Sequence, residues 1–266
     1  TSNGNTGLKN WVKGTSCKTK GKPLVIGIAG KYTGSSDTYI SILKALEHCS
    51  FKTGRKVEIK WIETTSIERG EQSIEEAMKG VDGAIVPGGF GVRGAEGKIA
   101  VAKYCREKNV PYLGLCLGFQ IALIDIARNV LNLKDANSTE FKPKVKYPVI
   151  DLLPEQMDIE GLGGNMRLGG REIDIKEGTI ASKIHGNVTK IRRRFRHRFE
   201  CNPEYIEQFE SAGVVFSGKA PKQPIMQILE LPKHKFFMAS QFHPEFTSRP
   251  MHPDELFLEF TKNCAK

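Results

Sequence analysis

The stretch YLGLCLGFQ, residues 112–120, decides the fold of this chain. Its first four residues form a short apolar run typical of a buried strand, and residues 119–130 have the periodicity of an amphipathic helix. Between them lies Gly-x-Cys-x-Gly, with glycines where a strand and a helix crowd together. This pattern indicates a nucleophile elbow with Cys116 in place of serine, at a helix N-terminus that would favour the thiolate. A buried structural cysteine at a strand end is the alternative.

Strand and helix patterns alternate on the N-terminal side of this stretch. Short apolar runs typical of buried strands occur at residues 23–29 and 83–86, and residues 57–62 alternate as a strand does. Helical periodicity occurs at residues 38–48, 67–78 and 97–108. The alternation predicts a mostly parallel sheet that is covered by helices.

The pattern changes after residue 136, where glycine and turn residues become frequent. Residues 149–153 and 171–175 predict short antiparallel strands added to the sheet. A helix at 204–212, short strands at 214–216, 225–229 and 236–239, and a helix at 254–263 follow. We therefore predict an α/β fold, with a mostly parallel central sheet flanked by helices and with added short antiparallel strands. One domain would cover residues 23–266, and residues 1–22 would be a linker or tail from an upstream domain.

The composition is that of a globular protein with a large core: 266 residues, 39% hydrophobic and 26% charged. No apolar run approaches the ~20 residues that span a bilayer. The six cysteines show neither a CxxC spacing nor a histidine at zinc-finger distance, which predicts free thiols in a reducing cytoplasm and no metal site. The net charge of +10 raises nucleic acid binding as an alternative.

Two further segments could carry chemistry. In QFHPE, residues 241–245, His243 follows a strand and has Glu245 two positions later, which suits a base oriented by an acid. A surface histidine in a turn is the alternative. In VPGGFG, residues 86–91, a strand ends in a glycine-rich loop that could direct N–H groups at a developing oxyanion. A phosphate-binding loop or a plain turn is the alternative, although the P-loop and dinucleotide patterns are absent.

The basic segment RRRFRHRFE, residues 192–200, alternates charged and aromatic positions. Alternation favours a strand with one buried face, in which an arginine is available to bind a carboxylate. A basic stripe with interleaved phenylalanines that binds nucleic acid is the alternative.

Together these segments resemble the class I (triad) glutamine amidotransferases, through GLCLGFQ, VPGGFGVRG and QFHPEF. More narrowly, ANSTEF at 136–141, GGNMRLGG at 163–170 and RRFRHRFECN at 193–202 are similar to the glutaminase domains of the CTP synthase family. The resemblance runs from about Pro23 to the C-terminus. The chain differs in having Phe119 and Phe199, where family members often have methionine and tyrosine, and in YTGSSD at 32–37.

The resemblance implies a role for each motif residue. Cys116 would form a thioester with the glutamine side chain, His243 would transfer protons, and Glu245 would orient His243. The backbone N–H groups of Gly89 and Leu117 would form the oxyanion hole. Further contacts to the substrate would come from Gly118, Phe119, Gln120, Glu140 and Arg198. Of these, Gln120 and Glu140 would hold the amino-acid end of glutamine, and Arg198 its α-carboxylate.

The resemblance also implies partners. Glutamine would be hydrolysed to glutamate and ammonia without a cofactor in this domain. The ammonia would pass to a synthetase domain, absent from this chain, that uses ATP and magnesium to aminate UTP to CTP in pyrimidine biosynthesis. GTP would be an activator, with Arg93 as its candidate contact, and the full-length enzyme would be a homotetramer. No nucleic acid or membrane partner is implied.

Two other classes of function compete with this interpretation. The same fold could serve as a regulatory or assembly module without catalysis, and the basic segment could bind RNA or DNA. The ordered set of Cys116, Glu140, Arg198 and His243 favours the enzyme.

Overall fold

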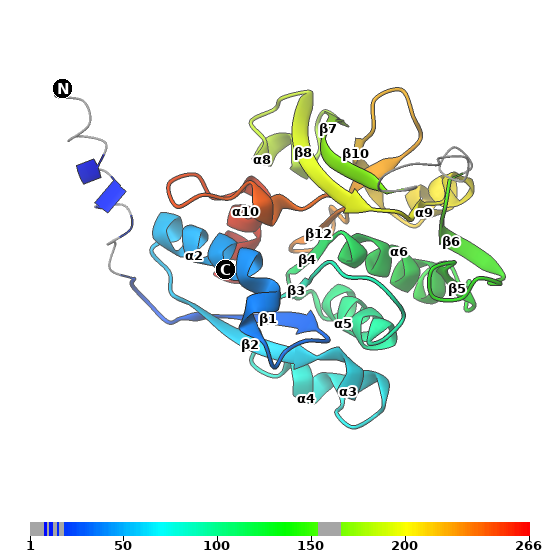
Figure 1. Cartoon of the computed structure of the whole chain (residues 1–266), viewed down its shortest axis with the longest axis horizontal. Helices are drawn as coiled ribbons and strands as arrows, with labels where there is room; N and C mark the ends of the chain where they lie inside the picture. Colours follow the sequence, from blue (N-terminus) through cyan, green and yellow to red (C-terminus); the bar gives the residue numbers. More distant parts are fainter. Residues whose placement is uncertain (1–7, 10, 13–14, 16–18, 154–165) are drawn as a thin grey trace.

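The computed structural model describes residues 8–9, 11–12, 15, 19–153 and 166–266. Its centre is a nine-stranded sheet in the order β2-β1-β3-β4-β12-β11-β10-β7-β8 (Figure 1). The parallel part contains β2 (Val57–Glu63), β1 (Leu24–Gly30), β3 (Gly83–Val86), β4 (Tyr112–Leu115) and β12 (Phe237–Ser240). The antiparallel extension contains β11 (Met226–Glu230), β10 (Val215–Lys219), β7 (Arg167–Ile175) and β8 (Lys190–His197). The predicted α/β fold is confirmed.

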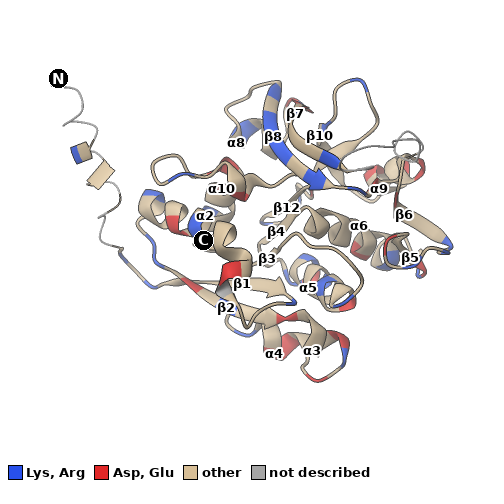
Figure 2. Ribbon diagram, viewed as in Figure 1, with Lys and Arg blue, Asp and Glu red and all other residues tan. Residues whose placement is uncertain are grey.

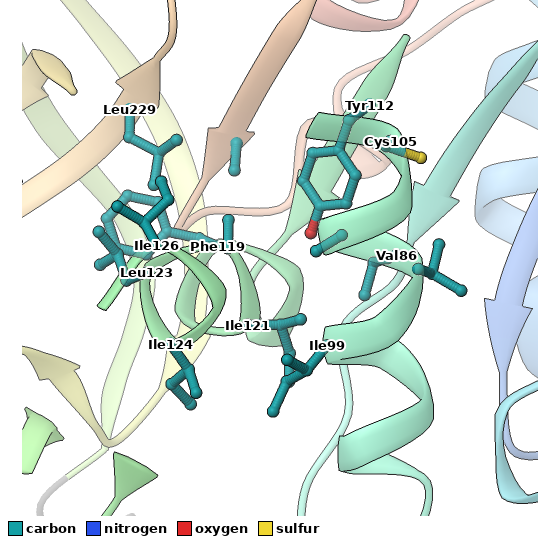
Figure 3. Close-up of a cluster of buried hydrophobic side chains, with 14 of the residues drawn as sticks. Val86, Ile99, Cys105, Tyr112, Phe119, Ile121, Leu123, Ile124, Ile126 and Leu229 are labelled. Atoms are coloured by element: carbon teal, nitrogen blue, oxygen red, sulfur yellow. The ribbon is translucent and has the colours of Figure 1, made fainter. Parts of the chain in front are cut away.

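Helices cover both faces of the parallel part (Figure 1). One layer contains α2 (Ile40–Thr53) and α10 (Glu255–Cys264), and the other contains α5 (Ala95–Lys108) and α6 (Leu117–Asn129). Each layer has its own apolar core, and Figure 3 shows the core beneath α5 and α6, where Tyr112 and Phe119 are fully buried. Because both faces of the sheet are covered, its inner strands are apolar throughout.

The remaining elements are short. They are the 3-10 helices η1 (Ser36–Tyr39), η2 (Pro203–Tyr205) and η3 (Pro244–Phe246), the helices α3 (Thr64–Glu68), α4 (Ile74–Met78), α8 (Ile180–Ile184) and α9 (Ile206–Ser211), and the strands β5 (Ala136–Ser138), β6 (Tyr147–Asp151) and β9 (Glu200–Cys201). Within the described ranges, no helix is long and apolar enough to cross a lipid bilayer.

Two sequence predictions about these elements were wrong. The single helix expected at 67–78 is two helices, α3 and α4, because Gly70 has a positive φ of 72° and Ser73 caps α4 in a capping box with Glu76. The strand near residue 150 does not extend the main sheet. It belongs to a second sheet, in the order β5-β6-β9, where it pairs parallel with β5 and, as predicted, antiparallel with another strand, β9. Part of the GGNMRLGG motif, residues 163–165, lies outside the described residues.

The basic segment forms strand β8, as its alternation predicts. Phe195 and His197 are buried, whereas Arg192, Arg194 and Arg196 are exposed. Figure 2 shows basic positions recurring along the β8 ribbon. Strand β8 also reaches the carboxyl end of the parallel strands, because the N–H of His243, which follows β12, donates to the Arg194 carbonyl at 2.9 Å.

Candidate active site

Cys116 occupies a strained turn between β4 and α6. Its backbone has φ 53° and ψ −98°, a combination that non-glycine residues rarely adopt, and it is the N-cap residue of α6. The Cys116 N–H donates to the Ser240 carbonyl at 2.7 Å, which ties the turn to the end of β12. The structure thus contains the elbow that the sequence predicts, with the sulfur at the carboxyl edge of the sheet.

Two glycines make this turn possible by allowing close backbone contacts. A Cβ atom at Gly118 would lie 2.1 Å from the Val86 carbonyl oxygen, and one at Gly114 would lie 2.7 Å from the Gly118 carbonyl. Any side chain at either position would therefore push α6 away from β3 and β4. The Gly-x-Cys-x-Gly spacing is a packing requirement of the elbow.

His243 and Glu245 form a buried pair just after β12. His243 Nδ1 and Glu245 Oε1 are 2.7 Å apart, and both residues are 9% exposed. The His243 ring also stacks on Phe246, with ring centroids 5.2 Å apart. Burial alone would lower the pKa of His243, but hydrogen bonding and charge from Cys116 and Glu245 outweigh it and raise that pKa to about 10. The imidazole is therefore protonated at neutral pH when it faces a thiolate.

The sheet brings Cys116 and His243 together, because β4 and β12 are parallel neighbours. A Cβ atom at Gly88, on the loop after β3, would lie 3.0 Å from His243 Cε1 and 3.4 Å from Cys116 Cβ. The glycine-rich loop therefore packs against both side chains. A larger residue there would have to displace the His243 ring by a few tenths of an ångström.

These groups line one cavity of about 350 Å³ at the carboxyl ends of β3, β4 and β12. It is bordered by Cys116, His243, Glu245 and Gly89, all of which the sequence singled out. The cavity is also lined by residues to which the sequence assigned no individual role, namely Lys31, Tyr32, Tyr39, Lys98, Arg196 and Phe246. The arrangement can present a thiolate, an imidazolium and backbone N–H groups to one bound carboxamide.

The other predicted substrate residues do not line this cavity. Phe119 is fully buried in the core beneath α6, so only its backbone can face a ligand. Gln120 is buried and donates through Nε2 to the Phe199 carbonyl at 2.8 Å. Glu140 accepts a hydrogen bond of 2.7 Å from the Gly91 N–H, which places its carboxylate on the glycine-rich loop. Arg198 is exposed beyond the end of β8, and Arg196, two residues earlier, is the arginine that lines the cavity.

The rim of the cavity contains cations and aromatic rings. The Arg93 guanidinium lies 5.0 Å from the centroid of the Tyr32 ring, and Lys31 Nζ donates to the Phe90 carbonyl. The Arg196 guanidinium lies 6.0 Å from the centroid of Phe90, which is 47% exposed. Such a surface suits a planar anionic ligand. Nothing in the sequence around Lys31 and Tyr32 indicates that these residues contact Phe90 and Arg93 in the segment after β3.

No group of three or more His, Cys, Asp or Glu side chains that could hold a metal ion exists among the residues described above. Of the six cysteines, the five that fall in the described ranges are free and buried. The sixth, Cys17, lies outside the described residues.

Comparison with known proteins agrees with this geometry. Residues 35–263 match the family described as glutamine amidotransferase class-I. The chain is 51% identical over 241 residues to a CTP synthase of Thermococcus gammatolerans, and 49% identical over 249 residues to one of Archaeoglobus fulgidus. These alignments cover 90% and 94% of this chain but 44% and 46% of the relatives. The chain therefore spans about half the length of the curated relatives it matches.

Solved structures give the same result. A Trypanosoma brucei CTPS glutaminase domain with bound acivicin is 34% identical, superposes with a TM-score of 0.84 and is covered over 94% of its length. PurLQS from Thermotoga maritima, at 12% identity and a TM-score of 0.54, shares the fold alone. Since the family match spans most of the chain and the trypanosomal domain is covered almost from end to end, this chain belongs to the class I glutamine amidotransferase family, as a glutaminase domain of the CTP synthase type.

Proposed function

We propose that this chain hydrolyses L-glutamine to glutamate and ammonia with Cys116 as the nucleophile. The observation that carries the proposal is the strained Cys116 turn beside an imidazole whose other nitrogen is bound to the buried Glu245 carboxylate. This is the arrangement that nucleophilic acyl transfer requires: a thiol, a base and a group that orients the base.

The reaction has two steps. The Cys116 thiolate attacks the carboxamide carbon and forms a C–S bond, and His243 gives its proton to the nitrogen as the C–N bond breaks and ammonia leaves. Water then attacks the thioester, His243 accepts its proton, and the C–S bond breaks to release glutamate. Glu245 holds the imidazole in the required tautomer and stabilises its protonated form.

The negative charge that develops on the carboxamide oxygen would be stabilised by two backbone N–H groups. Leu117 is the first residue of α6, so its N–H has no partner within the helix. Gly89 lines the same cavity from the opposite loop, and a Cβ atom there would lie 3.6 Å from Leu117 Cδ2. The Gly89 loop therefore packs against the first residue of α6, which supports an oxyanion hole between the two N–H groups.

The remaining substrate contacts are also proposals. Glu140 is an acceptor suited to the α-ammonium group of glutamine, and its bond to the Gly91 N–H holds it beside the loop. Arg198 is the candidate for the α-carboxylate. Gly118, Phe119 and Gln120 follow Cys116 in the first turn of α6, where their backbone would contact the substrate. Arg196 is a second candidate for the carboxylate, because it lines the cavity.

The partner of this domain would correspond to the part of the CTP synthase relatives that the alignments do not cover. The chain covers 44% of the Thermococcus CTP synthase, so we propose that ammonia passes to a synthetase domain that aminates UTP with ATP and magnesium. GTP would activate it through the rim where Arg93 contacts Tyr32. Residues 1–22 would link the two domains in a cytoplasmic homotetramer. The basic and aromatic rim supports an anionic effector of this shape.

The decisive test is covalent labelling with a glutamine-like electrophile, such as a chloro-dihydroisoxazole amino acid, followed by intact mass and peptide mapping. Burial raises the pKa of the Cys49 thiol to about 12 and raises those of Cys105, Cys201 and Cys264 as well. These thiols should stay unlabelled, and Cys17→Ser removes the sixth. We expect one adduct, on Cys116, that excess glutamine prevents. Labelling spread over several cysteines, or equal labelling of Cys116→Ala, would refute the proposal.

A further inference from the structure

Lys98 is a buried lysine beside the cavity that contains Cys116. It lies in the first turn of α5, yet it is only 2% exposed. Its Nζ reaches the Pro87 carbonyl at 3.4 Å and lies 3.6 Å from the point where a Cβ atom of Gly89 would stand. The side chain therefore runs beneath the glycine-rich loop to the cavity that contains Cys116.

The surroundings of Lys98 do not neutralise it. An ammonium group has three donors, but among the described residues Nζ has one hydrogen-bond acceptor, at a long distance, and no carboxylate in ion-pair range. Burial, reinforced by the positive charge of Lys31, lowers the pKa of Lys98 to about 8, while the Cys116 thiolate acts in the opposite direction. An apolar side chain of the same length would fill this space without the cost of burying a charge.

We propose that Lys98 is a positioning residue of the glutaminase centre, which holds the Pro87–Gly89 loop through the Pro87 carbonyl and sets a positive charge beside Cys116 and the oxyanion hole. The inference rests on the proposed function for its catalytic consequence, but its effect on the thiolate does not require glutamine. Nζ lies 3.6 Å from the point where a Cβ atom of Gly89 would stand and lines the cavity of Cys116, so its charge is close to the space where negative charge develops in both steps. The substrate residues that the resemblance implies do not include this lysine.

Two substitutions separate the charge from the loop contact. Lys98→Met removes both and preserves the length of the side chain, whereas Lys98→Gln removes the charge but keeps an N–H donor for the Pro87 carbonyl. Lys108→Met, in the last turn of the same helix, is the matched control for loss of a charge far from the cavity. All are made in the Cys17→Ser background, with the full chain.

The first readout is the rate of Cys116 alkylation by iodoacetamide as a function of pH, because it reports the thiolate alone. A nearby opposite charge changes the thiolate fraction about tenfold or more. We expect both Lys98 variants to react about tenfold more slowly at neutral pH, with the profile displaced to higher pH. The glutaminase kcat should fall about 10- to 100-fold while KM stays within about threefold. Lys108→Met should behave as the unmodified chain does.

The outcomes discriminate clearly. If Lys98→Gln retains normal alkylation and kcat, or if Lys98→Met does so while folded, the charge has no role and the proposal is wrong. If Lys98→Met does not fold, Lys98→Gln alone decides the question. If the unmodified chain fails to hydrolyse glutamine yet the alkylation profiles still shift, the proposed function fails and the role of Lys98 stands.

Discussion

Gly118→Ala tests whether the close approach of α6 to β3 shapes the oxyanion hole. The added Cβ would lie 2.1 Å from the Val86 carbonyl oxygen, and real Cβ atoms essentially never approach closer than 3.0 Å. The contact must therefore open by 3.0 − 2.1 = 0.9 Å. Since Val86 leads into the loop of Gly89 and Gly118 follows Leu117, the two proposed oxyanion donors would move apart by about that distance.

The expected cost is both thermodynamic and catalytic. Overpacking of this kind costs about 1–3 kcal/mol, which in a domain of this size lowers Tm by about 2–10 °C. Displacement of a catalytic group by about 1 Å lowers turnover about 100-fold. We therefore expect kcat for glutamine hydrolysis to fall about 100-fold in a chain that still folds.

The assay is ammonia release at saturating glutamine, with thermal unfolding measured on the same samples. Gly34→Ala is the matched control, because its Cβ would meet nothing within 4 Å, and it should leave kcat and Tm unchanged. A Gly118→Ala variant with kcat within threefold of the parent chain and an unchanged Tm would refute this reasoning. The contact between Gly118 and the Val86 carbonyl would then be neither tight nor important for the geometry of the oxyanion hole.

Three further predictions concern the other groups of the site. Cys116→Gly should be about 1 kcal/mol more stable than Cys116→Ala in thermal unfolding, because glycine adopts the φ 53°, ψ −98° backbone with less strain. Both variants should lack activity. A more stable alanine variant would mean that the turn is unstrained. The folded-state pKa of Lys98, about 8, lies below its ordinary 10.5, so the unfolded chain binds more protons between these values. The free energy of unfolding of the parent chain, measured by urea titration, should consequently rise by about 2 kcal/mol relative to that of Lys98→Met between pH 8 and 10. If the unfolding free energies of the two proteins change equally with pH, the charge of Lys98 is not buried. His243→Ala should lower kcat more than Glu245→Gln does, since proton transfer contributes more than orientation, and the reverse order would invalidate the assigned roles.

Much of the fold could be predicted because the parallel strands carry strong local signals. Gly83–Val86 and Tyr112–Leu115 are four-residue apolar runs bounded by turn residues, and each is a strand over the predicted range. The break between α3 and α4 was missed because the apolar periodicity continues across it. The capping box of Ser73 and Glu76 was the signal that could have located it. The pairing of β6 with β5 depends on contacts distant in sequence, which periodicity does not encode.

The site could be predicted only in part, for a similar reason. Cys116 and the pair His243 and Glu245 follow strands, so the topology of a parallel sheet places them at one edge. The approach of Tyr32 to the Arg93 loop depends on how two loops fold over that edge, and no spacing in the sequence encodes it. Arg196 and Arg198 lie on one alternating strand and its extension, so the sequence could not say which of them faces the cavity.

Lys98 shows the limit most clearly. In the sequence it follows a glutamate and a glycine at the beginning of a helix, where a lysine is ordinarily exposed. It is buried because Gly97, whose Cβ would lie 2.0 Å from the Thr64 carbonyl, brings α5 against α3, and because the Pro87–Gly89 loop closes over it. A charge that costs stability and has no carboxylate partner among the described residues is not explained by packing. Its place beside the proposed nucleophile would give the charge a chemical use, and that place exists only in the folded chain.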